Sequence, residues 1–381
     1  MNESNPQPVI HFRNLDILRF IAAFMIIIYH TYIIWSGAFG SPDFMLKAGT
    51  SDLSVFGKYF ETFVKNLSTG VDVFFLISGF LITYILLQEK ERYGKLNIKN
   101  FFLRRGLRIW PLYFFLIAIA PLLVSWIDVE KPHYLSNIFF YHNFYLIDTK
   151  AWMFPFAHFW SICIEEHFYL VWPFIIAFVP KKRLLSVLYL VIFSSIVYRA
   201  YLVISGGEVW FNCYLNTLSR IDVITVGAIG AYFYSKKPFV LHIPPVLRII
   251  SYISLIALFS IDTYVDWGGF FLAVFKKYIY IGLFCIAICN YMFNPDAKLS
   301  FKKKNILHYF GRISYGIYMY GNILLLILIK KLAMLNYITN FYVFVLVAFS
   351  LSILIPIISY ELYEKHFLKL KDRFALIKTK R

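Results

Sequence analysis

Arg19 and His30 are the residues in the first long apolar stretch whose types could do chemistry. They are eleven positions apart, and at about 100° per residue this spacing places both side chains on nearly one face of a helix. An imidazole can take a proton from a hydroxyl group. Because ionisable residues within a membrane are costly, the pair predicts a functional site facing protein or a water-filled cavity. The alternative is a histidine that only hydrogen-bonds a neighbouring helix.

The segment FFLRRGLRIWP carries a second group of charges, Arg104, Arg105 and Arg108. Arg105 and Arg108 are three residues apart and share a helix face. Guanidinium groups bind phosphates in a forked geometry and stay charged, so these arginines could hold a phosphorylated ligand. Anchoring of a helix end at the cytoplasmic membrane surface explains the same residues without a ligand.

A third group lies in HFWSICIEEHFYLVWP at 158–173. His158, Ser161, Glu165 and Tyr169 recur there at helical spacing and form a polar stripe on an apolar helix. Glu165 is therefore predicted to face the interior, at a level similar to that of His30, where an acid and a base could meet. Glu166 falls on a neighbouring stripe and ranks second.

A purely structural role is the alternative for Glu165. In that case its carboxylate would pair with Arg199 or Arg220 and hold the helices together.

Composition indicates the elements that must position these residues. The chain has 381 residues, of which 60% are hydrophobic and only 15% charged, which is too apolar for one water-soluble core. The sequence thus predicts an all-α polytopic membrane protein. Ten segments are long and apolar enough to span: 15–36, 69–88, 106–127, 157–180, 183–205, 217–235, 244–262, 268–293, 306–330 and 339–364.

The distribution of charge predicts the orientation. The formal net charge of +17 comes mainly from the connections around 90–105, 181–183 and 302–304 and from the tail at 365–381, which all fall on one side of the ten spans. Cytoplasmic loops collect lysine and arginine, so both termini are predicted to be cytoplasmic, and the charge does not indicate nucleic acid. The connections 37–68 and 128–156 are expected to be loops or re-entrant segments at the opposite mouth.

Nothing in the sequence divides the chain further. The opening stretch lacks the cleavage pattern of a signal peptide. The four cysteines show neither zinc-ligand nor disulfide spacing. We expect one membrane domain over 1–381, without an appended soluble domain and without a metal.

These motifs together resemble the acyltransferase-3 family of integral membrane O-acyltransferases. The matching pieces are LDILRFIAAFMIIIYH at 15–30, GVDVFFLISGFLI at 70–82, FFLRRGLRIWPLYF at 101–114 and FWSICIEEHFYLVWP at 159–173. Weaker matches are RIDVITVGAIGAYF at 220–233, ISYGIYMY at 313–320 and SYELYEKHF at 359–367. Their order and spacing cover nearly the whole chain.

The resemblance implies transfer of an acyl group, most simply acetyl, from cytoplasmic acetyl-CoA to a hydroxyl of an extracytoplasmic or lipid-linked glycan, in a bacterial inner membrane. It implies His30 as the general base, Arg19 as its partner, Arg105 and Arg108 as the arginine pair for the acyl-CoA, and Glu165 as the motif glutamate. Arg104 is expected to bind the cofactor beside this pair. The substrate-binding or supporting residues would be Glu166, Ser161, Tyr169, Asp16 and Ser78.

Several alternatives stay open from the sequence. The acyl group could rest on Ser161 or Ser78 before transfer, although direct transfer is preferred. Asp16 could pair with Arg19. Relatives commonly carry histidine where this chain has Gly321, which leaves the role of that position open. Gly70, Gly79, Gly227 and Gly230 favour close helix packing over ligand contact.

Two other classes of function compete with an enzyme. Ten helices with buried charges also describe a transporter or flippase for a lipid-linked or anionic solute, but the two halves of the chain show no matching pattern. A non-catalytic assembly subunit would use His30 and Glu165 only for packing.

Overall fold

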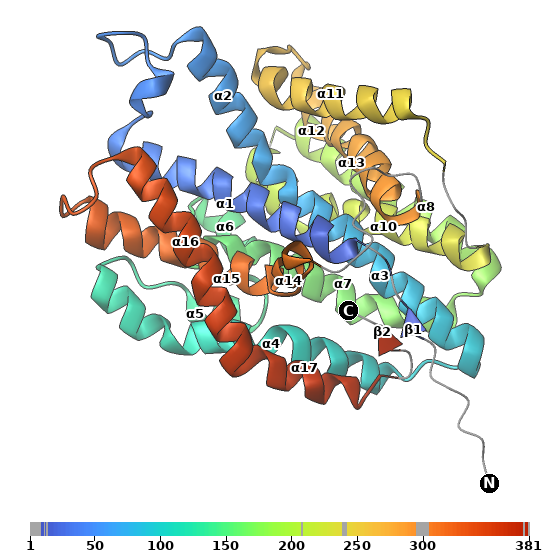
Figure 1. The fold of residues 1–381 in the computed structure, drawn as a ribbon. Helices are drawn as coiled ribbons and strands as arrows, with labels where there is room; N and C mark the ends of the chain where they lie inside the picture. Colours follow the sequence, from blue (N-terminus) through green and yellow to red (C-terminus); the bar gives the residue numbers. More distant parts are fainter. Residues whose placement is uncertain are drawn as a thin grey trace.

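The computed structural model describes residues 9–10, 12, 14–206, 209–237, 242–294, 305–375 and 378–379, and it is a bundle of long helices (Figure 1). The long helices are α1 (Leu15–Phe39), α3 (Gly70–Tyr93), α4 (Ile98–Ile127), α7 (Trp160–Phe178), α8 (Lys181–Ile204), α10 (Thr217–Lys236), α11 (Pro245–Ile261), α13 (Lys276–Phe293), α15 (Ser314–Leu328) and α16 (Phe341–Ser359).

Shorter elements connect or extend these helices. The α-helices among them are α2 (Val55–Asn66), α5 (Tyr134–Ile138), α6 (His142–Thr149), α9 (Val209–Leu215), α12 (Gly269–Val274), α14 (Ile306–Arg312) and α17 (Lys365–Asp372). Single turns of 3-10 helix lie at Asp43–Met45, Leu67–Thr69, Ala157–Phe159 and Asp262–Tyr264, and π-helical turns at Ile329–Ala333 and Tyr360–Glu364. Strands β1 (Val9–Ile10) and β2 (Lys378–Thr379) pair in parallel.

The basic connections lie at one end of the bundle, which we call the basic end. There α3 ends at Tyr93, α4 begins at Ile98, and Lys181 begins α8. The paired strands β1 and β2 lie at this end as well (Figure 1). Lys302, Lys303 and Lys304 lie outside the described residues. That the basic end is cytoplasmic remains a prediction.

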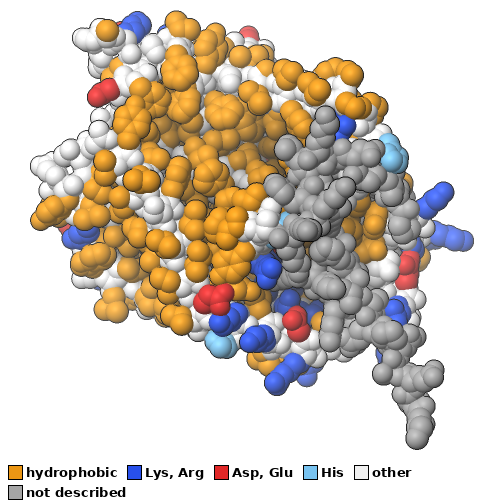
Figure 2. Space-filling view, viewed as in Figure 1, with side chains coloured by type: hydrophobic (Ala, Val, Ile, Leu, Met, Phe, Trp, Pro, Cys, Tyr) orange, Lys and Arg blue, Asp and Glu red, His pale blue; other side chains and the backbone are white. Residues whose placement is uncertain are grey.

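The surface confirms a membrane protein. Large apolar side chains are exposed along the helices, such as Leu122 at 75% and Phe178 and Ile204 each at 78% exposure. Figure 2 shows hydrophobic side chains over much of one face, with lysine and arginine mostly along its lower and right margins. Lipid, rather than water, is the solvent that suits such a surface.

Eight of the described helical stretches are long and apolar enough to cross a membrane. The other two segments predicted to span form α10 and α12–α13. Arg220 and Asp222 make α10 less apolar, and Lys276 and Lys277 do the same for α13. The fold is thus the polytopic helical bundle that composition predicted.

The connection 37–68 differs from the expected loop. Residues 55–66 form α2, which continues through one 3-10 turn into α3, so that Val55–Tyr93 is one helical stretch of 39 residues. The connection 128–156 does fold inward, because α5 and α6 bury Asn137, His142 and Asn143 completely. The Asn143 amide donates to the Leu215 carbonyl at 3.1 Å.

The tightest helix contact joins α3 to α10. A Cβ added at Gly79 would lie 1.8 Å from the Ile224 carbonyl oxygen, and one added at Gly227 would lie 2.1 Å from the Leu76 carbonyl oxygen. Two backbones that approach this closely leave no room for any side chain. The predicted packing role is confirmed at these two glycines, whereas a Cβ at Gly230 would make only an ordinary 3.5 Å contact with Phe80.

We expect Gly227→Ala to lower the stability of the purified protein by about 1–3 kcal/mol, because the helices must separate to admit the methyl group. Gly230→Ala, on the same helix, should not lower the stability. The higher helix propensity of alanine should instead raise it by up to about 1 kcal/mol. Thermal unfolding in detergent compares the two variants. Equal melting temperatures would contradict the close contact.

Candidate active site

A cavity with about 720 Å³ of empty space opens among α1, α3, α4, α7 and α15. Its charged lining is Arg19 from α1, Arg105 and Arg108 from α4, and Glu165 from α7. We call it the basic cavity, since three cations face one carboxylate. The helical spacings predicted from the sequence thus place both members of the arginine pair, together with Arg19, on the walls of one cavity.

The glutamate of α7 lies among these cations. Arg19 and Arg108 act electrostatically on the Glu165 carboxylate. The Arg105 guanidinium stacks 5.5 Å from the ring centre of Tyr169, and the Tyr169 hydroxyl is 2.6 Å from Ser78 Oγ. A cavity with excess positive charge and several hydroxyl groups suits a polyanionic ligand.

Besides His30, three of the predicted site residues do not line this cavity. Arg104 points elsewhere, where Nη2 lies 2.7 Å from Glu89 Oε1 and Nη1 donates to the Phe374 carbonyl at 3.0 Å. Glu166 accepts a hydrogen bond from the Trp110 indole at 3.2 Å. Asp16 sits near the start of α1, with its backbone carbonyl against Gly311.

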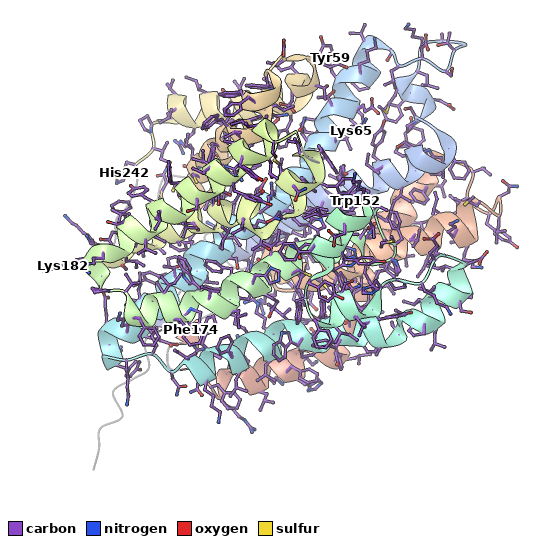
Figure 3. The ribbon with its side chains drawn as sticks, turned by 180° about the vertical axis from the view of Figure 1, so that it is seen from behind. Tyr59, Lys65, Trp152, Phe174, Lys182 and His242 are labelled. Carbon is purple, nitrogen blue, oxygen red and sulfur yellow. The ribbon has the colours of Figure 1, made fainter. Side chains whose placement is uncertain are left out.

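His30 lines a second cavity of about 650 Å³, which we call the histidine cavity. The imidazole reaches toward the carbonyl of Ile26, one helical turn earlier. Trp152 from the folded connection lies over this cavity, and Figure 3 shows Trp152 well away from Lys182 at the basic end. The histidine cavity therefore lies toward the opposite end of the bundle.

His158 faces the same cavity, and sequence reasoning did not select it as a site residue. Its Nε2 is 3.1 Å from the Met319 carbonyl, and its Nδ1 is 3.3 Å from the amide nitrogen of Asn322. A carbonyl only accepts, so Nε2 carries the proton and Nδ1 accepts from the amide. Both nitrogens of His158 are therefore engaged, and its ring lines the same cavity as His30.

Val71 and Tyr318 line both cavities, so the two cavities are adjacent at these residues. Glu165 and His30 consequently stand in adjacent cavities and not in a shared one. The Tyr318 hydroxyl lies at this junction, 2.7 Å from Ser161 Oγ, and donates to the His158 carbonyl at 2.7 Å. In the sequence, Tyr318 belongs to the matching piece ISYGIYMY at 313–320, which was not selected as part of the site.

Buried ion pairs elsewhere engage the two partners that the structural alternative gave to Glu165. Arg199 pairs with Asp222 at 2.9 Å, and Lys277 contacts the same carboxylate at 2.7 Å. Arg220 pairs with Asp72 at 2.5 Å. Both arginines proposed as partners of Glu165 are therefore committed to other carboxylates.

The fold and the cavities define a polytopic membrane protein in which a cationic cavity and a histidine-bearing cavity approach from opposite ends. The chain matches the acyltransferase domain family, Acyl_transf_3, over residues 12–361. It belongs to this family of acyltransferases, as its motifs predicted, and the match favours an enzyme over a transporter.

Similar curated proteins carry related names. The chain is 29% identical over 337 residues to "O-acetyltransferase OatA" of Staphylococcus aureus strain NCTC 8325, covering 80% of this chain and 49% of that protein. It is 28% identical to "Peptidoglycan O-acetyltransferase OatA" of Listeria monocytogenes, covering 81% and 48%. The chain thus spans about half the length of these relatives. No solved structure matches it.

We expect Asp222→Asn to destabilise the protein by about 3–5 kcal/mol, because it leaves Arg199 and Lys277 buried without a carboxylate. The matched change Glu165→Gln should lower the stability of the protein much less, since Glu165 borders an open cavity. Thermal unfolding in detergent measures both. A larger loss in Glu165→Gln would show that Glu165 is the structural ion-pair partner instead.

Proposed function

We propose that this chain transfers an acetyl group from acetyl-CoA, bound at the basic end, to a hydroxyl of a glycan presented at the opposite end. The observation that carries the proposal is the pair of adjacent cavities that share Val71 and Tyr318 in their linings. Donor and acceptor would occupy separate cavities, and their reacting groups would meet only at the junction.

The basic cavity suits the donor. Arg19, Arg105 and Arg108 against Glu165 give an excess of two positive charges, three minus one, which favours the phosphates of a nucleotide donor. Apolar side chains, including Phe74, line the rest of this cavity. A thin pantetheine arm would pass between them with its thioester at the junction.

His30 supplies the base. The imidazole takes the proton of the acceptor hydroxyl as its oxygen attacks the thioester carbonyl carbon. The new C–O bond forms, the C–S bond breaks, and the imidazolium returns the proton to the leaving sulfur. Direct transfer needs no acyl-enzyme, and it leaves Ser161 and Ser78 as hydrogen-bonding residues.

Glu165 receives a different role from the one expected on sequence. Standing in the basic cavity, its carboxylate would orient Arg19 and Arg108 and would not contact the imidazole. Arg19 would then place positive charge near the thioester carbonyl, where negative charge develops.

The names of the relatives support the acceptor class. Both are O-acetyltransferases, and one is named for peptidoglycan. A cell-wall glycan is accordingly our proposed acceptor, and we propose that the chain lies in a bacterial cytoplasmic membrane with the basic end inside.

We expect His30→Gln to reduce acetyl transfer by at least about 100-fold, the usual contribution of a general base, while CoA binding persists. Mass spectrometry of cell-wall glycans from cells carrying either form measures the loss of acetyl mass. Exposed His242, far from Trp152 in Figure 3, provides the control His242→Gln. Full acetylation by His30→Gln would remove His30 as the base.

Arg105→Ala should weaken CoA binding by about 10- to 100-fold, because a charge-assisted contact with phosphate is lost. Arg104→Ala is the matched control, since Arg104 is tied to Glu89 outside the cavity. Titration of the purified proteins with CoA gives both dissociation constants. An equal effect of the two substitutions would mean that Arg105 acts only as part of a basic surface.

A further inference from the structure

Val71 and Tyr318 are the residues common to the linings of the two cavities. We propose that this pair, which we call the neck, selects the acyl group by size and restricts transfer to a short one. The inference rests on the proposed function, because it assumes that a thioester reaches the neck from the basic cavity.

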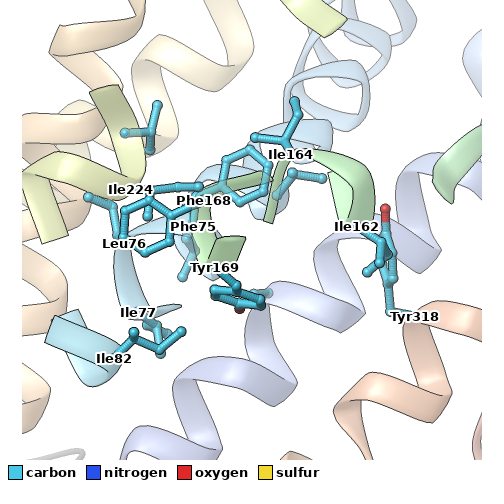
Figure 4. Close-up of a cluster of buried hydrophobic side chains, with 14 of the residues drawn as sticks. Phe75, Leu76, Ile77, Ile82, Ile162, Ile164, Phe168, Tyr169, Ile224 and Tyr318 are labelled. Atoms are coloured by element: carbon cyan, nitrogen blue, oxygen red, sulfur yellow. The ribbon is translucent and has the colours of Figure 1, made fainter. Parts of the chain in front are cut away.

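The Tyr318 side of the neck is fixed by hydrogen bonds to α7 and to the 3-10 turn that precedes it. The hydroxyl donates to the His158 carbonyl at 2.7 Å and lies 2.7 Å from Ser161 Oγ. The Tyr318 side chain is buried, at 8% exposure. Figure 4 shows it beside Ile162 of α7. A ring held by its hydroxyl in a packed interior cannot swing aside without breaking both contacts.

The Val71 side is fixed by its neighbours in sequence. Asp72 pairs with Arg220, and both side chains are buried. A Cβ added at Gly70 would lie 2.7 Å from the Ala22 carbonyl oxygen, so α3 is pressed against α1 directly before Val71. The backbone that carries Val71 therefore has little freedom to retreat.

Arg220 also braces the walls of both cavities. Its guanidinium carbon lies 5.8 Å from the ring centre of Phe75, which lines the basic cavity. The same carbon lies 5.8 Å from the ring centre of Trp160 and 5.4 Å from that of Tyr214, both in the histidine cavity. One buried cation thus fixes aromatic walls on either side of the neck.

A rigid neck has a direct chemical consequence. For the acceptor oxygen to reach the carbonyl carbon from the histidine cavity, the acyl group would lie at the neck, beside the side chains of Val71 and Tyr318. An added methylene would have to displace one of these fixed walls. A hydrophobic pocket distinguishes substrates that differ by one methylene by about 10- to 200-fold.

A competition between donors tests the neck. The purified protein in liposomes receives equal concentrations of acetyl-CoA and propionyl-CoA, with peptidoglycan strands as acceptor, and mass spectrometry counts the two esters. Val71→Ala should raise the propionyl-to-acetyl ratio at least about tenfold. Val73→Ala is the control, because Val73 is equally buried on α3 but lines neither of the two cavities, and it should leave the ratio unchanged.

A second variant, Tyr318→Phe, tests the neck even if Val71→Ala does not fold. Tyr318→Phe keeps the ring and removes both hydrogen bonds, so it should move the ratio in the same direction. An unchanged ratio in the folded variants, with acetyl transfer retained, would overturn the neck as the selecting element. If the unaltered protein transferred neither group, the proposed function would fail instead, so the two failures are distinguishable.

Discussion

The requirement that charge buried in an apolar bundle be neutralised governs this structure. Asp222 receives Arg199, Lys277 and the Tyr278 hydroxyl, and these contacts tie α10 to α8 and α13. Asp72 and Arg220 tie α3 to α10 in the same way. An ion pair in such surroundings adds little net stability, but losing one partner is expensive, so each pair enforces one arrangement of its helices.

The basic cavity differs from these ion pairs in being open. Its charged lining is three arginines and the carboxylate of Glu165. In the proposed function, the phosphates of the donor would bind among these arginines. The glycine contact between α3 and α10 serves the same arrangement, since it sets the distance at which Asp72 meets Arg220.

Helix periodicity predicted much of the site. The eleven-residue interval aligned Arg19 and His30 along α1, and Ser161, Glu165 and Tyr169 all reach the basic cavity. Helix periodicity does not predict where a residue lies across the bundle, in the plane of the membrane. Two residues can stand at one level in a membrane and still lie in different cavities, and for this reason Glu165 and His30 did not share one.

Other departures have equally local causes. Arg104 belongs to the same basic run as Arg105, and only the position of Glu89 on α3 shows that it turns away. Asn322 and Trp152 belong to patterns that indicate packing or interfacial anchoring, so nothing in the sequence marked them as cavity residues. The charges of α2 made a helical extension of α3 resemble a loop.

In the proposed function, the extension of α3 by α2 determines how deep into the membrane the acceptor sugar must go. Val55–Tyr93 is 39 residues long, about 58 Å at 1.5 Å per residue, whereas the hydrocarbon layer is about 30 Å thick. The outer part, with Lys58, Glu61 and Lys65, belongs among lipid headgroups or in water. Val71 follows Lys65 by six residues, about 9 Å along the helix. In the proposed function, a sugar at the end of the bundle opposite the basic end would thus meet the thioester just below the lipid surface, without entering the middle of the bilayer.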